Sequence, residues 1–259
     1  MEKTLFAQID EALARGESVA LCTVIESHGS VPRHTGSKML VFEDGSFSGS
    51  IGGGELESRV LKEAGRALAD GKARKLSYSL TDPARGDPGL CGGQVEVFVE
   101  ALFPPAKIVV IGGGHVGRAV THLAKWLGFR VAVSDDRPEF CSPETNPEAD
   151  EFYPVPMAEL PAALKINRQT YLVLTTRGSA VDVAGLPSLL ESPAAYIGVI
   201  GSKRRWQATL RRLQAGGLSA EKIARAHSPL GLEIQAETPE EIAVSILAEI
   251  IARRNGAKE

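Results

Sequence analysis

Apolar segments separated by turn residues along the first hundred positions are typical of antiparallel strands. They predict strands at 18–27, 39–42, 46–51, 76–80 and 94–101, the last two with apolar residues at every second position. Glu43-Asp44-Gly45 stands between the second and third of these and predicts a hairpin turn. Apolar residues at helical spacing predict an amphipathic helix within 2–16 and a second one from Glu55 to about residue 68. We therefore expect a mixed α+β domain here.

After residue 105 the pattern changes to short, continuous apolar runs that each precede a helical segment. The runs lie at 108–111, 129–134, 170–176 and 194–201, and helices are expected near 118–128, 181–190, 202–213 and 239–251. Such runs are typical of parallel strands buried on both faces. Residues 137–156 are rich in proline and are expected to be irregular. Phe103-Pro104-Pro105 predicts a stiff linker, so the expected domains are 1–103 and 104–259, the second a Rossmann-like doubly wound parallel sheet.

The run at 108–111 leads into the glycines Gly112, Gly114 and Gly117, at the spacing G-x-G-x-x-G, with His115 between the last two. In a nucleotide site the first glycine permits the turn, the second admits a diphosphate, and the third lets the helix pack closely. Asp135 ends the next strand, where a carboxylate would hold a ribose. This order predicts a Rossmann unit. A bound dinucleotide is a separate prediction, because a fold does not fix its ligand.

Two other segments offer sites for an anion. Gly52, Gly53 and Gly54 lead into a helix that begins at Glu55, and the N–H groups of such a turn can bind a phosphate. The same glycines are equally consistent with a tight turn that has no ligand. Ser202, Lys203 and Arg204 follow another strand of the expected parallel sheet, at the edge where ligands bind.

Charge and cysteine content narrow the range of functions. The formal net charge of −3 argues against general nucleic-acid binding. Three widely spaced cysteines, without a C-x-x-C pair, predict no zinc site or disulfide framework and favour a reducing cytoplasm. The first residues do not resemble a signal peptide, and no apolar stretch is long enough to predict a membrane span. Cys91 lies in a Pro/Gly-rich loop and is the cysteine least expected in a core.

Five motifs in order resemble the XdhC/CoxI family of accessory factors for molybdenum hydroxylases. They are GSVPRHTGSKMLVFEDGSFSGSIGGGELE, GLCGGQVEVFVE, IVVIGGGHVG, YIGVIGSKRRW and SPLGLEIQAETPEEIAVSILAEI. The resemblance implies that the N-terminal domain handles the molybdenum cofactor (molybdopterin) and that Gly52–Glu55 and Cys91 belong to its signatures. It also implies support of cofactor sulfuration, with a cysteine desulfurase as sulfur donor, and delivery to a xanthine dehydrogenase-like apoenzyme. A homodimer is left open.

The sequence departs from the family pattern at three positions. Ser179 stands where relatives often have a histidine, and Glu233 and Gln235 stand where Asp and Gly are usual. We therefore expect no enzymatic role that depends on that histidine, and a carrier rather than a catalyst. One alternative is an NAD(P)-dependent oxidoreductase with Asp135 on the ribose, which leaves the first hundred residues without a task. Another is a non-catalytic scaffold whose glycine turns are purely structural.

Overall fold

The protein consists of two compact units, which meet in sequence between Pro104 and Pro105. The computed structural model describes residues 4–82, 84 and 86–256. Each unit has its own sheet, antiparallel in the first and parallel in the second. The expected fold class, a mixed α+β domain followed by a Rossmann-like domain, is confirmed.

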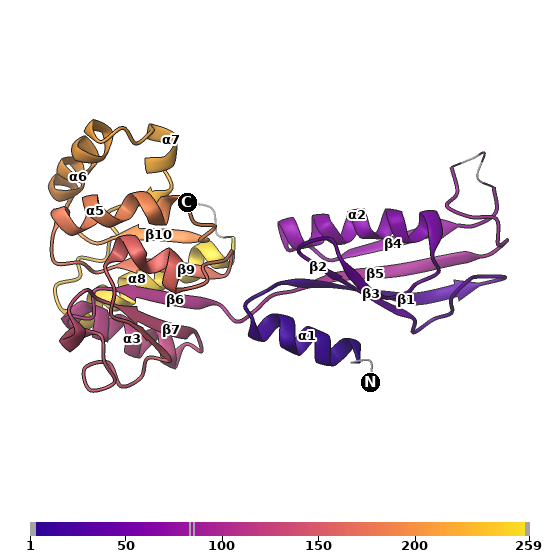
Figure 1. Ribbon diagram of the computed structural model, residues 1–259, viewed down its shortest axis with the longest axis horizontal. Helices are drawn as coiled ribbons and strands as arrows, with labels where there is room; N and C mark the ends of the chain where they lie inside the picture. The colour runs from indigo at the N-terminus through magenta and orange to yellow at the C-terminus, as the bar shows by residue number, and fades with distance from the viewer. Residues whose placement is uncertain (1–3, 83, 85, 257–259) are drawn as a thin grey trace. The chain divides into compact units, whose positions relative to one another are not determined.

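The first unit is a five-stranded antiparallel sheet with one helix on each face (Figure 1). Its strands are β1 (Val19–His28), β2 (Lys38–Phe42), β3 (Phe47–Gly49), β4 (Arg74–Ser79) and β5 (Gln94–Leu102), in the order β3-β2-β1-β5-β4. Its helices are α1 (Leu5–Ala14) and α2 (Gly54–Asp70). The hairpin predicted at Glu43–Gly45 joins β2 and β3.

Successive side chains of β1 point to opposite faces of the sheet, so they pack against different helices. Val19 and Leu21 pack with α1, whereas Ala20 and Cys22 pack with α2. Cys22 is fully buried and is therefore a core residue, as expected, and this burial raises the pKa of its thiol to about 12.

The second unit is a six-stranded sheet in which all neighbouring strands are parallel. Its strands are β6 (Lys107–Ile111), β7 (Arg130–Ser134), β8 (Glu151–Tyr153), β9 (Thr170–Leu174), β10 (Tyr196–Val199) and β11 (Ala226–His227). The spatial order β11-β10-β9-β6-β7-β8 reverses direction between β6 and β9. Open sheets of this kind bind ligands at the carboxyl ends of the strands flanking that switch point.

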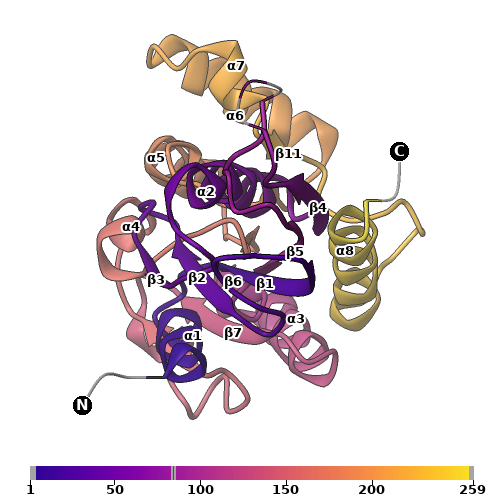
Figure 2. The same ribbon diagram turned by 90° about the vertical axis from the view of Figure 1, so that its right-hand side faces the viewer.

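Helices cover both faces of this sheet, and the alternation along β6 shows which helix covers which face. Ile108 and Val110 pack with α3 (His115–Trp126) and α8 (Pro239–Arg254). Val109 and Ile111 pack with α5 (Ser179–Leu190) and α6 (Lys203–Ala215). Figure 2 shows α3 and α8 near one another and α5 on the other side of β6.

Short elements in the second unit were not expected. The segment predicted to be irregular contains β8 and the 3-10 turn η2 (Pro138–Phe140), the 3-10 turn η3 (Met157–Glu159) follows it, and β11 has only two residues. Helices α4 (Leu160–Ala163) and α7 (Ala220–Ile223) are single turns. None of these is long enough to show a periodic apolar pattern, whereas tertiary pairing with β7 or β10 is enough to form the strands.

Candidate functional site

The glycine loop after β6 lies at the switch point, and its glycines differ in the space around them. A side chain at Gly112 would place its Cβ 2.6 Å from the carbonyl oxygen of Thr175, and one at Gly117 would collide with Gly112. At Gly114 an added Cβ would meet no atom within 4 Å. Gly112 and Gly117 are therefore required for packing, and Gly114 is the position open to a ligand.

Gly114 is also the N-cap of α3, and no side chain among the described residues caps this helix. The first N–H groups of a helix have no partner within it, and the helix dipole favours an anion there. His115, the first helical residue, is exposed. The backbone at Gly114 and His115 can accordingly hold a phosphate.

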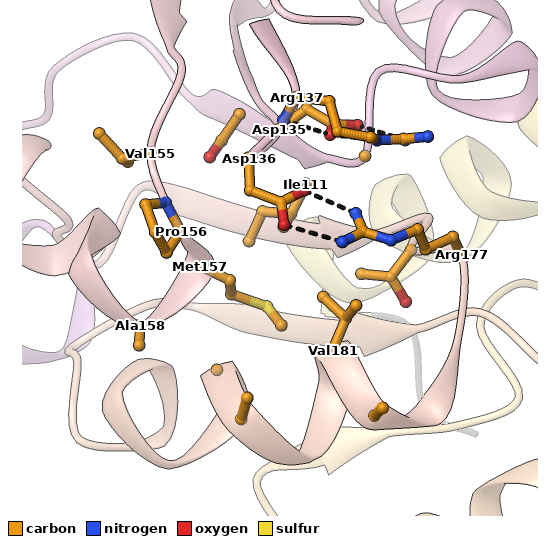
Figure 3. Close-up of a pocket in the computed structure, with 16 residues that line it drawn as sticks. Ile111, Asp135, Asp136, Arg137, Val155, Pro156, Met157, Ala158, Arg177 and Val181 are labelled. Atoms are coloured by element: carbon orange, nitrogen blue, oxygen red, sulfur yellow. Dashed lines mark hydrogen bonds and ion pairs between the residues drawn. The ribbon is translucent and has the colours of Figure 1, made fainter.

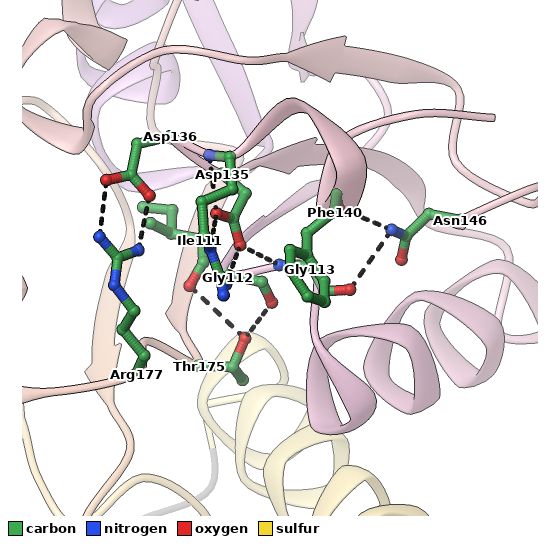
Figure 4. A network of polar contacts seen from close by, with 10 residues as sticks. Ile111, Gly112, Gly113, Asp135, Asp136, Phe140, Asn146, Thr175 and Arg177 are labelled. Carbon is green, nitrogen blue, oxygen red and sulfur yellow. Dashed lines mark hydrogen bonds and ion pairs between the residues drawn. The ribbon is translucent and has the colours of Figure 1, made fainter. Parts of the chain in front are cut away.

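Asp135 is almost fully buried and is occupied by the protein itself. Its Oδ2 accepts a hydrogen bond from the N–H of Gly113 at 3.1 Å (Figure 4). Arg137 donates to Oδ1 through its backbone N–H and Nε, and to Oδ2 through Nη2. The carboxylate therefore fastens the glycine loop to the segment after β7. A ribose would have to compete with these bonds.

A pocket of about 320 Å³ opens at the carboxyl ends of β6, β7 and β9 (Figure 3). Gly112 and Asp135 line it together, and Val155, Met157 and Val181 supply apolar surface. Ser134 also lines it, and its buried hydroxyl has no partner among the described residues. We call this the switch-point pocket. Its size suits a small organic ligand.

An ion pair lies across this pocket. Arg177, which follows β9, donates from Nη1 and Nη2 to the two carboxylate oxygens of Asp136 at 2.6 and 2.8 Å. These hydrogen bonds lower the pKa of Asp136 to about 2. Both residues line the pocket, so the pair connects the segments that follow β7 and β9.

A second ion pair lies behind the pocket, where α5 and α6 begin. Asp182 of α5 is fully buried and accepts from Arg205 Nη2 at 2.7 Å. Arg205 also donates to the hydroxyl of Thr176 at 2.8 Å, and that hydroxyl bonds to Asp182. This network joins the strand ends to the helix starts.

Ser202, Lys203 and Arg204, predicted as an anion site at the start of α6, differ in their surroundings. Ser202 is the N-cap, and its hydroxyl accepts from the N–H of Arg205. Lys203 and Arg204 are exposed and are not part of the lining of the switch-point pocket. It is therefore Arg205, and not Lys203 or Arg204, that binds the buried carboxylate of Asp182.

In the first unit, the triple glycine turn is already filled by a carboxylate of the same chain. Glu57 Oε1 accepts from the N–H groups of Ile51, Gly52 and Gly53 at 3.1, 3.3 and 2.8 Å, and from the Ser50 hydroxyl at 2.6 Å. Burial acts to raise the pKa of Glu57, but these hydrogen bonds outweigh it and lower that pKa. An external anion would have to displace Glu57.

Gly52 and the cysteine loop lie against one segment, residues 28–32. A Cβ at Gly52 would lie 2.6 Å from Pro32 Cγ. A Cβ at Gly93 would lie 2.5 Å from the carbonyl oxygen of His28, and the backbones of Gly29 and Gly93 also lie close together. Cys91 is exposed beside this contact, and Glu55 is exposed at the start of α2.

The cysteines and acidic residues show no metal centre. Among the residues that the structure describes, no group of three or more His, Cys, Asp or Glu side chains could hold a metal ion. Cys141 is buried and donates from Sγ to the carbonyl oxygen of Val133. No helix of the described chain has both the length and the apolar character that a membrane crossing requires.

Sequence reasoning missed three groups that shape these sites: Glu57, the pair Asp136–Arg177, and the pair Asp182–Arg205. For Asp182 a signal exists, because it falls in helical phase with the buried Leu186 and Leu189. Arg205 likewise shares a helical face with the buried Thr209 and Leu213. No comparable pattern marks Glu57.

Comparison with known proteins agrees with this architecture. The model of the XdhC Rossmann domain matches residues 108–250, and that of the XdhC and CoxI family matches residues 12–79. A solved structure described as a xanthine dehydrogenase from Bacillus halodurans has a TM-score of 0.53 and 23% identity, covering 97% of this chain and 96% of its own. At that identity the likeness shows a shared fold.

Three curated relatives are similar in sequence. YqeB of Escherichia coli K12 is 37% identical over 92% of this chain and 44% of its own, and a probable xanthine dehydrogenase component of Bacillus subtilis is 31% identical over 61% and 46%. The chain spans less than half the length of these two proteins. The molybdenum cofactor insertion chaperone PaoD of E. coli is 23% identical over 97% of this chain and 88% of PaoD. With a family model on each unit, the resemblance inferred from the motifs is confirmed, and the chain belongs to the XdhC and CoxI family.

Proposed function

We propose that this protein is an accessory factor that binds the molybdenum cofactor as cargo and delivers it to a xanthine dehydrogenase-like molybdenum hydroxylase. The observation that carries the proposal is the family match on both units, joined by the alignment with PaoD along 97% of this chain. The relatives named for xanthine dehydrogenase and for cofactor insertion support the same role.

The residues around Gly114 fit such a cargo. Molybdopterin carries a phosphate, and the uncapped start of α3 offers backbone N–H groups to it in a position without a side chain. Arg137 and Arg177 place positive charge beside the switch-point pocket, although each is paired with an aspartate.

The proposal is tested by isolating the protein from a host that makes the cofactor and measuring the oxidised pterin released from it by fluorescence. We expect pterin in an amount comparable to the protein, and activation of an apo-hydroxylase when the loaded protein is added. Absence of pterin, together with failure to activate, would contradict the proposal.

The finer part of the proposal concerns Cys91, which we assign to the sulfuration step. Its thiolate would attack the outer sulfur of a cysteine desulfurase persulfide, forming a sulfur–sulfur bond at Cys91 as the donor thiolate leaves. The exposure of Cys91 supports this role, whereas Cys22 and Cys141 are buried. The step involves no net oxidation or reduction, because one persulfide replaces another.

Cys91→Ser separates this role from cargo binding. We expect the variant to retain bound pterin, to lose hydroxylase activation, and to lack the mass of one added sulfur atom after incubation with desulfurase and cysteine. Cys22→Ala is the matched control, because that thiol is buried in the core. Full activation by Cys91→Ser would remove Cys91 from the mechanism, and loss of both pterin and activation would make it a pocket residue instead.

A further inference from the structure

The Asp136–Arg177 ion pair differs from the two other aspartate–arginine pairs near the switch-point pocket in its exposure to solvent. The side chain of Arg177 is 46% exposed and that of Asp136 is 36% exposed. In the other two pairs, the carboxylates of Asp135 and Asp182 are 2% and 0% exposed. Exposed ion pairs contribute little to stability, whereas a buried carboxylate that loses its partner is costly. The Asp136–Arg177 pair can therefore open at low cost while the other two stay closed.

The other polar side chains of the pocket lining are already bonded within the protein or out of reach. Arg137 is held by a buried carboxylate, and its guanidinium lies over the ring of Phe140, 4.0 Å from the ring centre. The hydroxyl of Thr176 belongs to the network behind the pocket, and Ser134 is fully buried. Among the described residues that line the pocket, Arg177 is thus the cation that a ligand can bind.

The wall of the pocket beside this ion pair is apolar. Ile111 of β6, Val155, Met157 and Val181 of α5 contribute to it, and Figure 3 shows Met157 and Val181 on one side of the pair. The volume of about 320 Å³ is near the lower end of the range for ligand pockets, about 300–1,000 Å³. The pocket therefore suits a single apolar ring with a polar group directed at the ion pair.

The surroundings of the pair favour an anion over a cation as that polar group. Helices α3 and α5 both begin at this edge of the sheet, and no side chain among the described residues caps either N-terminus. The positive ends of the two helix dipoles favour negative charge there. Arg137 also attracts the carboxylate of Asp136. That carboxylate consequently keeps a positive neighbour when Arg177 turns to another anion.

We propose that the switch-point pocket binds a compact ligand with an apolar ring and one carboxylate or phosphate group, and that this group replaces Asp136 as the partner of Arg177. The ring packs against Met157 and Val181. Asp136 is then an internal competitor, and it sets the threshold that a ligand anion must exceed in order to bind. The inference does not rest on the cargo proposed above, because it concerns Arg177 and its pocket and not the backbone at Gly114.

The test compares three probes that share a benzene ring, phenyl phosphate, benzoate and the uncharged benzamide, by titration calorimetry with the whole purified protein. We expect at least one of the two anions to bind at millimolar concentration, and benzamide to bind at least about tenfold more weakly. Arg177→Gln should weaken binding of the anion at least about tenfold. Asp136→Asn keeps the shape of the side chain but releases Arg177, so it should strengthen binding about 3- to 10-fold.

Opposite effects of the two substitutions establish the exchange, because either one breaks a purely structural ion pair in the same way. Lys222→Ala is the matched control, since it opens the exposed Lys222–Glu191 pair, which is not part of this pocket, and should leave binding unchanged. The anion that binds more tightly shows whether the pocket takes a carboxylate or a phosphate. Both side chains of the Asp136–Arg177 pair are half-exposed, so the unfolding midpoints of the two variants should stay close to that of the wild type.

Three results would overturn the inference: failure of both anions to bind at millimolar concentration, equal binding of benzamide, or weaker binding in Asp136→Asn as well as in Arg177→Gln. Binding of phenyl phosphate that neither substitution changes would likewise place the anion elsewhere. The released-pterin measurement does not depend on any of these results. The two proposals can therefore fail separately.

Discussion

The carboxylate of Asp135 accepts a hydrogen bond from the backbone N–H of Gly113, 3.1 Å away, and thereby joins the ends of β6 and β7. Arg137 donates to the same carboxylate, so an acidic residue at the position where nucleotide-binding folds hold a ribose is here part of the scaffold. Asp135 thus holds the glycine loop in place, and the space beside Gly114, where an added Cβ would meet no atom within 4 Å, remains open to a ligand.

We expect Asp135→Ala to lower the free energy of unfolding by about 1–3 kcal/mol, because it leaves the buried Gly113 N–H without an acceptor and removes the carboxylate that pairs with the partly exposed Arg137. Urea denaturation measures this loss. Asp136→Ala is the matched control, and its half-exposed pair with Arg177 should contribute less than about 1 kcal/mol. Equal, small losses in both variants would show that Asp135 does not support the loop.

Gly114→Val should weaken binding of a phosphate-bearing ligand without changing the unfolding midpoint appreciably. Its φ of −71° suits any residue, and the added Cβ meets open space that a diphosphate would occupy. Gly117→Val should instead unfold the domain or destabilise it by several kcal/mol, because a side chain there collides with Gly112. Retained ligand affinity in a folded Gly114→Val protein would exclude the loop from binding.

Glu57→Ala should destabilise the first unit by about 1–3 kcal/mol, since three backbone N–H groups and the Ser50 hydroxyl lose their acceptor. If the vacated turn binds anions, inorganic phosphate will restore part of the thermal stability of Glu57→Ala and will not affect the wild type. A variant that phosphate fails to stabilise would show that the turn is structural only.

The same carboxylate predicts a pH dependence. The pKa of Glu57 in the folded state lies below its ordinary value of 4.5. Its stabilising contribution is therefore complete above pH 4.5 and is lost as the pH falls through the folded-state pKa. Denaturation of wild type and Glu57→Gln from about pH 3 to about pH 6 tests this, because the difference in stability between the two proteins should shrink toward the acidic end. A constant difference would contradict it.

Lys203→Ala/Arg204→Ala should leave stability nearly unchanged, because both side chains are exposed. If they bind the phosphate of the cargo, affinity falls by one to several decades, roughly, and its salt dependence becomes weaker. Arg205→Ala should cost about 3–5 kcal/mol of stability, since it leaves Asp182 buried without a counter-ion. Unchanged affinity and salt dependence in the double variant would make Lys203 and Arg204 a solvated helix end.

The sequence was sufficient to predict the elements that have a long apolar pattern or a specific local motif. The run 108–111 with its glycines predicted β6, the loop and α3, and the helix expected near 239–251 is α8, which begins with a capping box formed by Thr238 and Glu241. β8 and β11 were not predicted, because the three residues of β8 and the two of β11 form strands only through pairing with β7 and β10, respectively.

The candidate site could be located from the sequence but its partners could not. Parallel strands place Ile111, Leu174 and Val199 at one level, so the edge where Gly112 and Ser202 lie follows from the pattern. Which carboxylate pairs with which arginine depends on helix packing over long separations, as in Asp182 with Arg205. Hence Asp135 and the triple glycine were predicted as ligand groups, while the structure bonds Asp135, Gly52 and Gly53 to the protein itself.

The contact of residues 28–32 with Gly52 on one side and Gly93 on the other has a mechanical consequence. Neither contact has room for a methyl group, so residues 28–32 are held between two positions where an added Cβ would collide with them. A side chain introduced at Gly52 or at Gly93 would displace the same segment, so the triple glycine turn and the cysteine loop are sterically linked through it.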